Sequence, residues 1–229
     1  MILLKKWEDL PEAFRTPEVR PYYDILARKP VSLAVKRIFD IGMSAVLIVL
    51  LACPMGVIAI LVKKSSEGPV FYRQQRITTY GKPFRIHKFR TMVNHADQIG
   101  SEVTVGDDKR ITPIGARLRK YRLDELPQVF DIFCGNMSFV GTRPEVKRYV
   151  DAYTPEMYAT LLMPAGVTSE TSILYKDEAE LLEKSADPDR TYIETILPEK
   201  MKYNLASLKN FNIFNDLKTM VKTIAAVLK

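Results

Sequence analysis

One long apolar segment dominates the hydropathy pattern of this 229-residue chain. Residues 41–62 contain no charged side chain, and basic pairs lie on both sides, Lys36-Arg37 before and Lys63-Lys64 after. As a straight helix these residues would extend about 33 Å, which is enough to cross the hydrocarbon core of a bilayer. A buried helix of a soluble protein is rarely this long and apolar on all sides. The pattern therefore predicts a membrane segment.

Cys53-Pro54 lies near the middle of this segment. Proline removes a backbone donor and clashes with the preceding turn, so it can kink the helix. Because basic pairs flank both ends, the positive-inside rule assigns no orientation and is compatible with two cytoplasmic ends. The residues alone leave two arrangements open: a single span, and a kinked re-entrant helix that enters and leaves by one face.

Shorter elements are predicted on both sides of the apolar segment. Residues 1–30 form an irregular arm with short helices, whose aromatic side chains either rest at a lipid–water interface or pack on the main domain. Residues 70–75 and 83–89 are strand-like around a turn at 79–82, which predicts a β-hairpin. Helical patterns cover the following ranges: 113–121, 124–135, 145–152, 178–185, 191–208 and 213–229.

The last of these helices is amphipathic, so it fits either contact with a membrane surface or packing on the domain. The whole pattern predicts an α-rich α/β fold, in which the membrane helix carries a domain of short helices and a small antiparallel sheet. We divide the chain into an arm (1–30), a membrane helix (31–64) and a domain (65–229) with interfacial amphipathic helices.

Charge and cysteine content narrow the class of partner. The net charge of +7 and the pI near 9.3 favour an anionic partner: a phosphate ligand, a nucleic acid or an anionic lipid surface. The two cysteines, Cys53 and Cys134, do not form a disulfide framework, and Cys53 lies in the apolar run. This composition fits a reducing, cytosolic environment.

The stretch Arg119–Gln128 carries the clearest candidate chemistry. It places adjacent carboxylates, Asp124 and Glu125, directly after a basic cluster. In such a setting one carboxylate can attack a phosphate and the other can hold a metal ion. The alternative is structural: Asp124 caps a helix, and Glu125 interacts favourably with the helix dipole.

Three further basic residues are candidate phosphate ligands. Lys88 and Arg90 lie at the end of the second predicted strand, where the alternative is that both are solvated strand charges. Arg143 precedes Pro144 at the predicted start of a helix, where a guanidinium can bind phosphate oxygens through two hydrogen bonds. A structural salt bridge is the alternative for Arg143.

These motifs, in this order, resemble a known family, the bacterial sugar transferases of the small monotopic polyprenyl-phosphate phosphoglycosyl transferase type. The motifs are the apolar run with its central proline, Lys88–Met92, Leu123–Gln128, Met137–Pro144 and Asp216–Ile224. The resemblance covers residues 31–229, and the arm looks like the extensions seen on some members.

The resemblance implies an enzyme with its active site on the cytosolic face of the bacterial inner membrane. It would transfer a sugar-1-phosphate from a nucleoside-diphosphate sugar, usually UDP-linked, to polyprenyl (undecaprenyl) phosphate and release UMP. This is the first membrane step of polysaccharide or glycoconjugate synthesis. By resemblance, Asp124 forms a covalent phosphosugar intermediate, and Glu125 with Asp124 holds Mg²⁺. Lys88, Arg119 and Arg143 match phosphate-binding positions, and Arg90 matches a basic position.

The family also implies that the membrane helix at 31–64 is re-entrant, broken at a Ser-Pro pair where this chain has Cys53-Pro54. It further implies that residues 65–229 form a cytosolic catalytic domain. Two other departures are Thr142, where many members have proline, and the loop Gly166-Val167-Thr168-Ser169, where the family often has Gly-Ile-Thr-Gly.

Two other classes of function compete with an enzyme. A non-catalytic module on anionic membrane lipids explains the charge and the apolar run but leaves Asp124 and Glu125 without a role. Nucleic-acid binding leaves the membrane segment unexplained. We therefore expect membrane lipids but no nucleic acid among the partners; the sequence specifies neither the sugar nor the oligomeric state.

Overall fold

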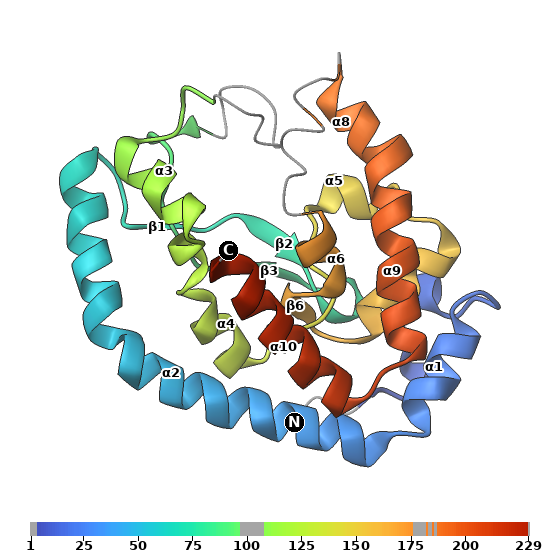
Figure 1. The fold of residues 1–229 in the computed structure, drawn as a ribbon. Coiled ribbons are helices and arrows are strands. Elements are labelled where there is room, and N and C mark those ends of the chain that lie inside the picture. Colours follow the sequence, from blue (N-terminus) through green and yellow to red (C-terminus); the bar gives the residue numbers. More distant parts are fainter. Residues whose placement is uncertain (1–3, 97–107, 176–181, 183–184, 186, 229) are drawn as a thin grey trace.

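A single long helix organises the structure. The computed structural model describes residues 4–96, 108–175, 182, 185 and 187–228. Helix α2 (Pro30–Ser65) has 36 residues and continues through Pro54 without a break in its helical assignment. Figure 1 shows it curving around α4 and α3, so that its two halves border different sides of the domain. The helix exists as predicted, and the re-entrant insertion stays a prediction.

The N-terminal arm packs on the domain. It contains two 3₁₀ turns, η1 (Trp7–Asp9) and η2 (Glu12–Phe14), and helix α1 (Arg20–Ala27). Five apolar side chains of the arm belong to the largest buried cluster of the described chain: Leu10, Phe14, Val19, Tyr22 and Leu26. The same cluster includes residues of α9. Of the two alternatives for the arm, packing is the one confirmed.

The predicted hairpin is confirmed. Strands β1 (Phe71–Tyr72) and β2 (Gln75–Ile77) pair antiparallel with β4 (Lys88–Phe89) and β3 (Pro83–Arg85), with Phe71 opposite Phe89 and Gln75 opposite Arg85. The turn between them is the 3₁₀ turn η3 (Thr79–Gly81), in which Tyr80 and Gly81 adopt positive φ angles of 57° and 74°.

The prediction of one small antiparallel sheet is wrong in part, because the described strands form three separate pairs and one is parallel. Strand β5 (Met137–Val140) pairs with β6 (Ala165–Thr168) in parallel, with Met137 opposite Ala165. A parallel pair needs a long connection, which is supplied here by α5 (Lys147–Val150) and η6 (Pro155–Leu162). Gly141 and Gly166 allow the two strand ends to meet, since a Cβ on Gly166 would lie 2.1 Å from the Gly141 nitrogen.

The two central helices follow the predicted signals closely. Helix α3 (Pro113–Lys120) begins after Thr112, whose hydroxyl accepts a hydrogen bond from the Gly115 amide at 3.1 Å. Helix α4 (Gln128–Cys134) ends at Gly135, whose φ is 87°. It starts four residues later than predicted, because residues 123–125 form the separate 3₁₀ turn η5 (Leu123–Glu125).

The remaining helices come from the C-terminal part of the chain. They are α6 (Glu170–Leu174), α8 (Pro188–Thr191), a π-helical turn η7 (Tyr192–Ile196), α9 (Leu197–Lys209) and α10 (Ile213–Leu228). Helix α5 is shorter than the predicted 145–152, and the predicted helix at 178–185 lies almost entirely outside the described residues.

A second apolar cluster connects α2 to the helices that carry the candidate site. The second half of α2 contributes Met55, Ile58 and Val62, which pack with Phe89, Leu118 and Val129 of β4, α3 and α4. At the other end of α2, Arg37 donates to the last carbonyls of α4, Ile132 O at 2.7 Å and Phe133 O at 2.8 Å. The long helix is therefore attached to the domain at both ends.

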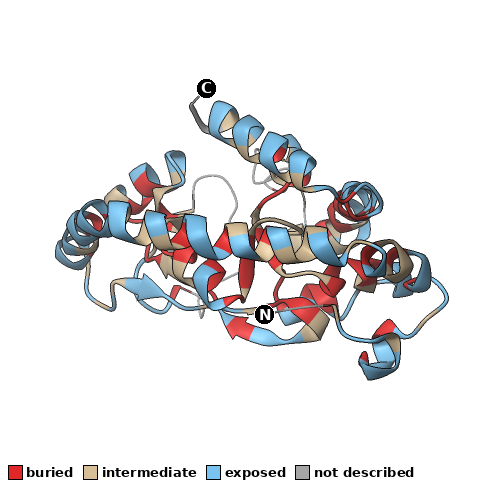
Figure 2. Ribbon diagram, turned by 90° about the horizontal axis from the view of Figure 1, so that it is seen from below, coloured by how far each residue is buried: buried red, intermediate tan, exposed pale blue. Residues whose placement is uncertain are grey.

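Much apolar surface on α2 and α10 remains exposed (Figure 2). Val49 and Leu50 of α2 are 75% and 66% exposed, and Phe214 and Val221 of α10 are 73% and 67% exposed. Among the described residues, α2 is the one helix long and apolar enough to cross a membrane. Contact with lipid would remove these side chains from water.

Replacing Gly115 with alanine is expected to destabilise the region around α3. The new Cβ would lie 2.0 Å from the Thr91 carbonyl oxygen and 2.7 Å from the Thr91 Cα, and backbone atoms cannot move aside cheaply. We expect a loss of roughly 3 kcal/mol, measured by thermal unfolding in detergent. Gly42→Ala on α2 is the control, because its Cβ would meet no atom within 4 Å. Equal melting temperatures for the two variants would contradict the prediction.

Candidate active site

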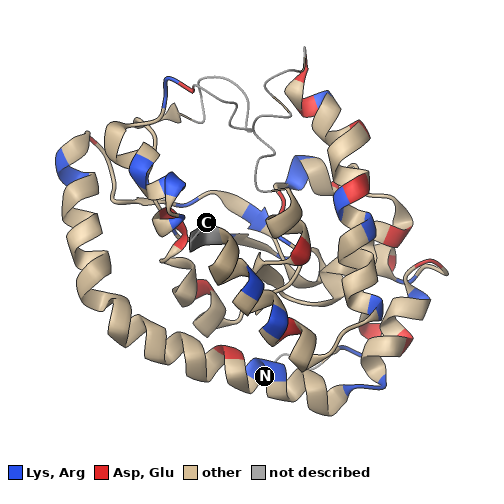
Figure 3. Ribbon diagram, viewed as in Figure 1, with Lys and Arg blue, Asp and Glu red and all other residues tan. Residues whose placement is uncertain are grey.

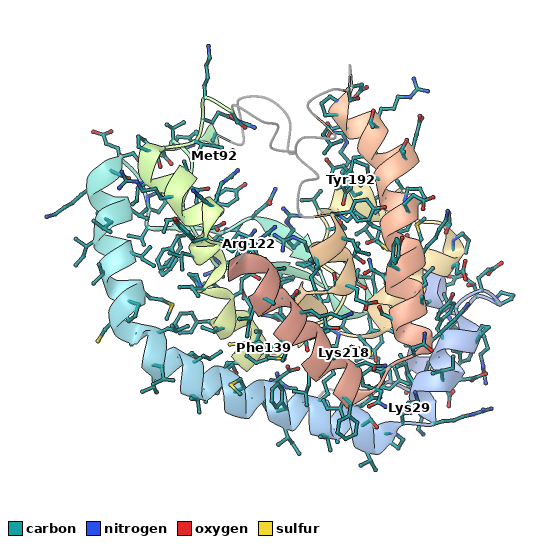
Figure 4. The ribbon with its side chains drawn as sticks, viewed as in Figure 1. Lys29, Met92, Arg122, Phe139, Tyr192 and Lys218 are labelled. Carbon is teal, nitrogen blue, oxygen red and sulfur yellow. The ribbon has the colours of Figure 1, made fainter. Side chains whose placement is uncertain are left out.

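Two adjacent carboxylates lie on one short turn between α3 and α4. The turn, η5, follows Arg122, whose backbone adopts a left-handed conformation with φ of 53°. Such a conformation costs a non-glycine residue on the order of 1 kcal/mol. It ends α3 abruptly and turns the chain so that Asp124 is buried, with 9% of its surface exposed. Arg122 is labelled at this point in Figure 4.

Glu125 binds two cations from different parts of the chain. Lys88 of β4 donates to Glu125 Oε1 at 2.8 Å. The Arg143 guanidinium donates to both carboxylate oxygens, with 3.3 Å between NH1 and Oε2 and a shorter contact between NH2 and Oε1. Burial opposes the ionisation of Glu125, but Arg143 and Lys88 outweigh it and hold its pKa well below the usual value. Glu125 is therefore an ionised anchor for both cations.

Asp124 differs from its neighbour. Within the part of the chain that the structure describes, its carboxylate has no hydrogen bond or ion pair. Burial raises the pKa of Asp124, and the nearby charge of Glu125 adds to the increase, while Lys88, Arg119 and Arg143 act in the opposite direction. A buried carboxylate without a hydrogen-bond partner, surrounded by cations, is available to react with or bind an added group.

Arg119 approaches the site from α3. Its Nε donates to the Thr91 hydroxyl at 2.8 Å, which orients the side chain along the strand end that carries Lys88. Burial lowers the pKa of Arg119, and the charge of Asp124 partly opposes this decrease. The two side chains are therefore electrostatically coupled. Figure 3 shows basic residues of α3 next to the acidic turn η5.

Arg90 is placed differently from the other predicted cations. Its guanidinium donates to backbone carbonyls at and just after the C-terminal end of α2, including Ser66 O at 2.8 Å and Glu67 O. Only 5% of its surface is exposed. This arrangement does not support the prediction that Arg90 binds phosphate. Instead, Arg90 stabilises the turn between α2 and β1. Both terminal nitrogens of its guanidinium donate hydrogen bonds to carbonyl oxygens near the helix end.

Two further predicted features are the membrane-kink pair Cys53-Pro54 and the helix start at Pro144. Cys53 and Pro54 are both exposed on α2. Pro144 does not begin a helix, because α5 starts only at Lys147. Arg143 therefore does not lie at the start of α5, and it forms the salt bridge with Glu125 that the structural alternative predicts.

Sequence reasoning missed two charged residues close to this site. Arg76 of β2 donates to the Pro144 carbonyl at 3.1 Å, directly after Arg143. Glu145 is 6% exposed and accepts a hydrogen bond from the Tyr192 hydroxyl at 2.6 Å. The available signal was weak: Arg76 continues a strand pattern of mixed residues, and Glu145 resembles an acidic residue in a first helical turn.

Asp124 and Glu125 differ in their suitability as ligands for a divalent cation. Among the described residues, no three His, Cys, Asp or Glu side chains gather into a metal site. Mg²⁺ is often held by one or two carboxylates together with substrate phosphates and water. Asp124 fits this role because its oxygens carry no other bonds in the described structure, whereas both Glu125 oxygens are engaged by Lys88 and Arg143.

Comparison with known proteins identifies the family. The sequence model for bacterial sugar transferases matches residues 31–229. The chain belongs to the bacterial sugar transferase family. This family match includes the carboxylate turn, its three surrounding cations Lys88, Arg119 and Arg143, α2 after its first residue, and all of α10.

Individual members of the bacterial sugar transferase family show where the similarity extends. The chain is 33% identical over 207 residues to a UDP-N-acetylgalactosamine-undecaprenyl-phosphate N-acetylgalactosaminephosphotransferase of Aeromonas hydrophila, covering 89% of this chain and 46% of that protein. It is 31% identical over 198 residues to a UDP-glucose:undecaprenyl-phosphate glucose-1-phosphate transferase of Klebsiella pneumoniae, covering 85% and 40%. The chain thus spans less than half the length of these two relatives.

A third relative has a similar length. The exopolysaccharide production protein ExoY of Rhizobium meliloti is 32% identical over 216 residues, which is 88% of this chain and 88% of that protein. The similarity therefore covers most of this chain and most of ExoY.

Proposed function

We propose that this protein transfers a sugar-1-phosphate from a UDP-sugar to undecaprenyl phosphate and releases UMP. One observation supports this best: a buried carboxylate, Asp124, without a partner among the described residues lies in a cluster of cations held by its neighbour Glu125. The two transferases similar to this chain are named for UDP-sugars and undecaprenyl phosphate.

In the first step, an oxygen of the ionised Asp124 attacks the sugar-bearing phosphorus of the donor. A bond forms between that oxygen and phosphorus while the bond from phosphorus to the bridging oxygen breaks, and UMP leaves with the electron pair. Lys88, Arg119 and Arg143 stabilise the negative charge that develops on the phosphoryl oxygens and on the leaving phosphate. Glu125 keeps Lys88 and Arg143 oriented before the donor binds.

In the second step, a phosphate oxygen of undecaprenyl phosphate attacks the phosphorus of the phosphosugar–enzyme. The acyl-phosphate bond breaks, Asp124 regains its carboxylate, and the product is undecaprenyl-diphospho-sugar. Mg²⁺ bound at Asp124 would neutralise diphosphate charge and favour departure of the leaving group. Because Asp124 is buried, water has little access to the intermediate, which limits its hydrolysis.

The exposed apolar faces of α2 and α10 support a position at the bacterial inner membrane, with the site on the cytosolic face. The acceptor is itself a membrane lipid. An enzyme bound to the bilayer surface can therefore reach the phosphate group of undecaprenyl phosphate there. The role in exopolysaccharide or capsule initiation is proposed from the similarity to ExoY.

UMP release by the purified protein in nanodiscs tests the proposed function. The mixture contains undecaprenyl phosphate, Mg²⁺ and one UDP-sugar at a time, and UMP is quantified by chromatography. Release that requires both one donor and the lipid is the expected result. Lipid binding without UMP release from any donor of the panel would instead favour a non-catalytic membrane-surface module.

The pH dependence of UMP release is expected to follow the ionisation of Asp124. The nucleophile is active only when deprotonated, and burial raises its pKa, so the acid limb of kcat/KM should lie above the usual range of an aspartate. Lys88→Gln removes a cation that lowers this pKa, so the limb should move to still higher pH. Lys82→Gln, at the exposed hairpin turn, should leave it in place. An acid limb that Lys88→Gln leaves unmoved would contradict the assignment.

Both ends of α2 are expected to be labelled from the cytosolic side. Val31 and Ser65 are both exposed, so single cysteines can be introduced at these two positions. The background has Cys53 and Cys134 replaced, so that only the introduced cysteine reacts. A cysteine at Thr195, exposed on the π-helical turn, marks the side of the domain. Labelling of Val31→Cys or Ser65→Cys by a membrane-impermeant reagent from outside intact spheroplasts would favour a single span over a re-entrant helix.

A further inference from the structure

Arg76 lies beside the carboxylate site but takes no part in its ion pairs. Its NH1 donates to the Pro144 carbonyl at 3.1 Å, and its NH2 donates to Gln74 Oε1 at 2.6 Å. Its Nε is buried and has no partner among the described residues. Buried guanidinium nitrogens are normally hydrogen-bonded. Local bonding therefore leaves one donor of the Arg76 guanidinium, its Nε, unused.

The charge of Arg76 acts on the predicted phosphate ligands. Burial lowers the pKa of Lys88, and Arg143 and Arg76 add to this effect while Glu125 and Asp124 oppose it. Burial also lowers the pKa of Arg76, with Glu145 opposing and Arg143 adding to the decrease. Arg76, Lys88 and Arg143 thus form one cluster of mutually repelling cations. Such a cluster becomes favourable when a polyanion binds to it.

A buried network fixes the segment to which Arg76 is bonded. The backbone carbonyl of Glu145 accepts from the Ile77 amide at 2.9 Å, next to Arg76 in β2. The Glu145 side chain accepts from the Tyr192 hydroxyl at 2.6 Å, and Lys200 of α9 donates to the same hydroxyl at 2.9 Å. Glu145, Tyr192 and Lys200 are each less than 10% exposed.

Tyr192 enters this network through an unusual local structure. It is the first residue of the π-helical turn between α8 and α9, and its ring lies 4.6 Å from the ring of Tyr149 on α5. Figure 4 shows Tyr192 at this junction, beside α5. Single π-helical turns are rare and occur frequently at functional sites. Here the turn connects α9 to the segment Arg143–Glu145.

We propose that Arg76 is a further phosphate-binding residue of this site, specific for the diphosphate of the donor, and that Tyr192 is a positioning residue acting through Glu145. The inference rests on the proposed donor class. Arg76 contributes its charge and its unpartnered Nε donor, and the Glu145–Tyr192–Lys200 network fixes the segment that carries Arg143 and accepts a hydrogen bond from Arg76.

Binding of UDP and of uridine, each with Mg²⁺, to the nanodisc-held full chain tests this proposal without turnover. Arg76→Gln should weaken UDP binding about tenfold, because it removes charge-assisted hydrogen bonds to phosphate. It should leave uridine binding within about twofold, because uridine has no phosphate for Arg76 to bind. Arg73→Gln, on the same hairpin and exposed, makes the same change in charge and should alter neither. Arg76→Lys should fall between Arg76→Gln and wild type.

Tyr192→Phe removes one hydroxyl and keeps the ring. We expect an increase of roughly threefold in KM for the donor with kcat nearly unchanged, since one hydrogen bond that orients another group is lost. Arg76→Lys and Tyr192→Phe keep the test informative if Arg76→Gln does not fold.

The outcomes separate the proposals clearly. Equal UDP affinity for Arg76→Gln and Arg73→Gln, or an equal loss of UDP and uridine binding in Arg76→Gln, would overturn the role of Arg76 in phosphate binding. A wild type that does not bind UDP would overturn it as well. A wild type that binds UDP, with the expected dependence on Arg76, but releases no UMP from any donor would support the Arg76 assignment and defeat the proposed transfer.

Discussion

Asp124→Asn is expected to reduce UMP release by roughly a thousandfold or more, the scale on which loss of a nucleophile acts. The amide cannot form the acyl-phosphate bond, although it has nearly the same shape. Folding should be preserved, because burial already disfavours the charged form of Asp124 and a neutral amide removes that cost. The melting temperature should therefore stay the same or rise slightly.

Intact-protein mass spectrometry gives the second readout for Asp124. Wild-type protein with donor and no lipid acceptor should gain the mass of one phosphosugar, and Asp124→Asn should gain none. Asp151→Asn, an exposed carboxylate paired with Lys147, is the control and should behave as wild type. A variant at Asp124 that retains wild-type release would remove this residue as the nucleophile and require another mechanism.

Glu125→Gln is expected to impair both stability and activity. The substitution leaves Lys88 and Arg143 next to each other without their shared counter-charge. Breaking a fully buried pair costs about 3–5 kcal/mol. Because the side chains of Lys88 and Arg143 are 19% and 32% exposed, solvent lowers this cost, and we expect a loss of about 2 kcal/mol. Activity should fall because the cations lose their orientation.

The effect of Glu125→Gln should depend on pH with a defined sign. The pKa of Glu125 is depressed in the folded protein, so its contribution to stability is present above the pKa of the unfolded chain and is lost as the pH falls through the folded pKa. The melting temperatures of wild type and variant should therefore converge in acid. The double variant Glu125→Gln/Arg143→Met should be more stable than the sum of the single effects predicts, because it leaves one unpaired cation instead of two. Strict additivity would contradict the shared ion pair.

Local signals in the sequence predicted several elements correctly. Thr112-Pro113 marks the start of α3, Gly135 marks the end of α4, and the turn before Pro83 separates the hairpin strands. Each of these features depends on residues within a few positions of one another. Capping hydrogen bonds, a fixed proline φ and a positive φ at glycine are local interactions, so a sequence can specify them without knowledge of the fold.

Long-range features were predicted less well. The parallel pairing of β5 with β6 joins segments separated by about twenty-five residues, and nothing in either short strand indicates its partner. Lys88 begins β4 and Arg90 directly follows it, so strand alternation alone would place their side chains on the same face. In the structure Lys88 binds Glu125, whereas Arg90 binds carbonyls at the end of α2. Only the tertiary packing of α2 beside this strand separates the two side chains.

The sequence by itself determined the long apolar segment of α2, the start of α3, the end of α4, the hairpin, and the adjacent carboxylates with basic residues in the order of a bacterial sugar transferase. These follow from composition, local backbone preferences and motif order. The tertiary structure alone decided that Glu125 is the anchor for Lys88 and Arg143, that Asp124 remains free of partners among the described residues, and that Arg76 lies beside them. The physical reason is that burial and charge pairing depend on distances between segments far apart in the chain, which no local pattern encodes.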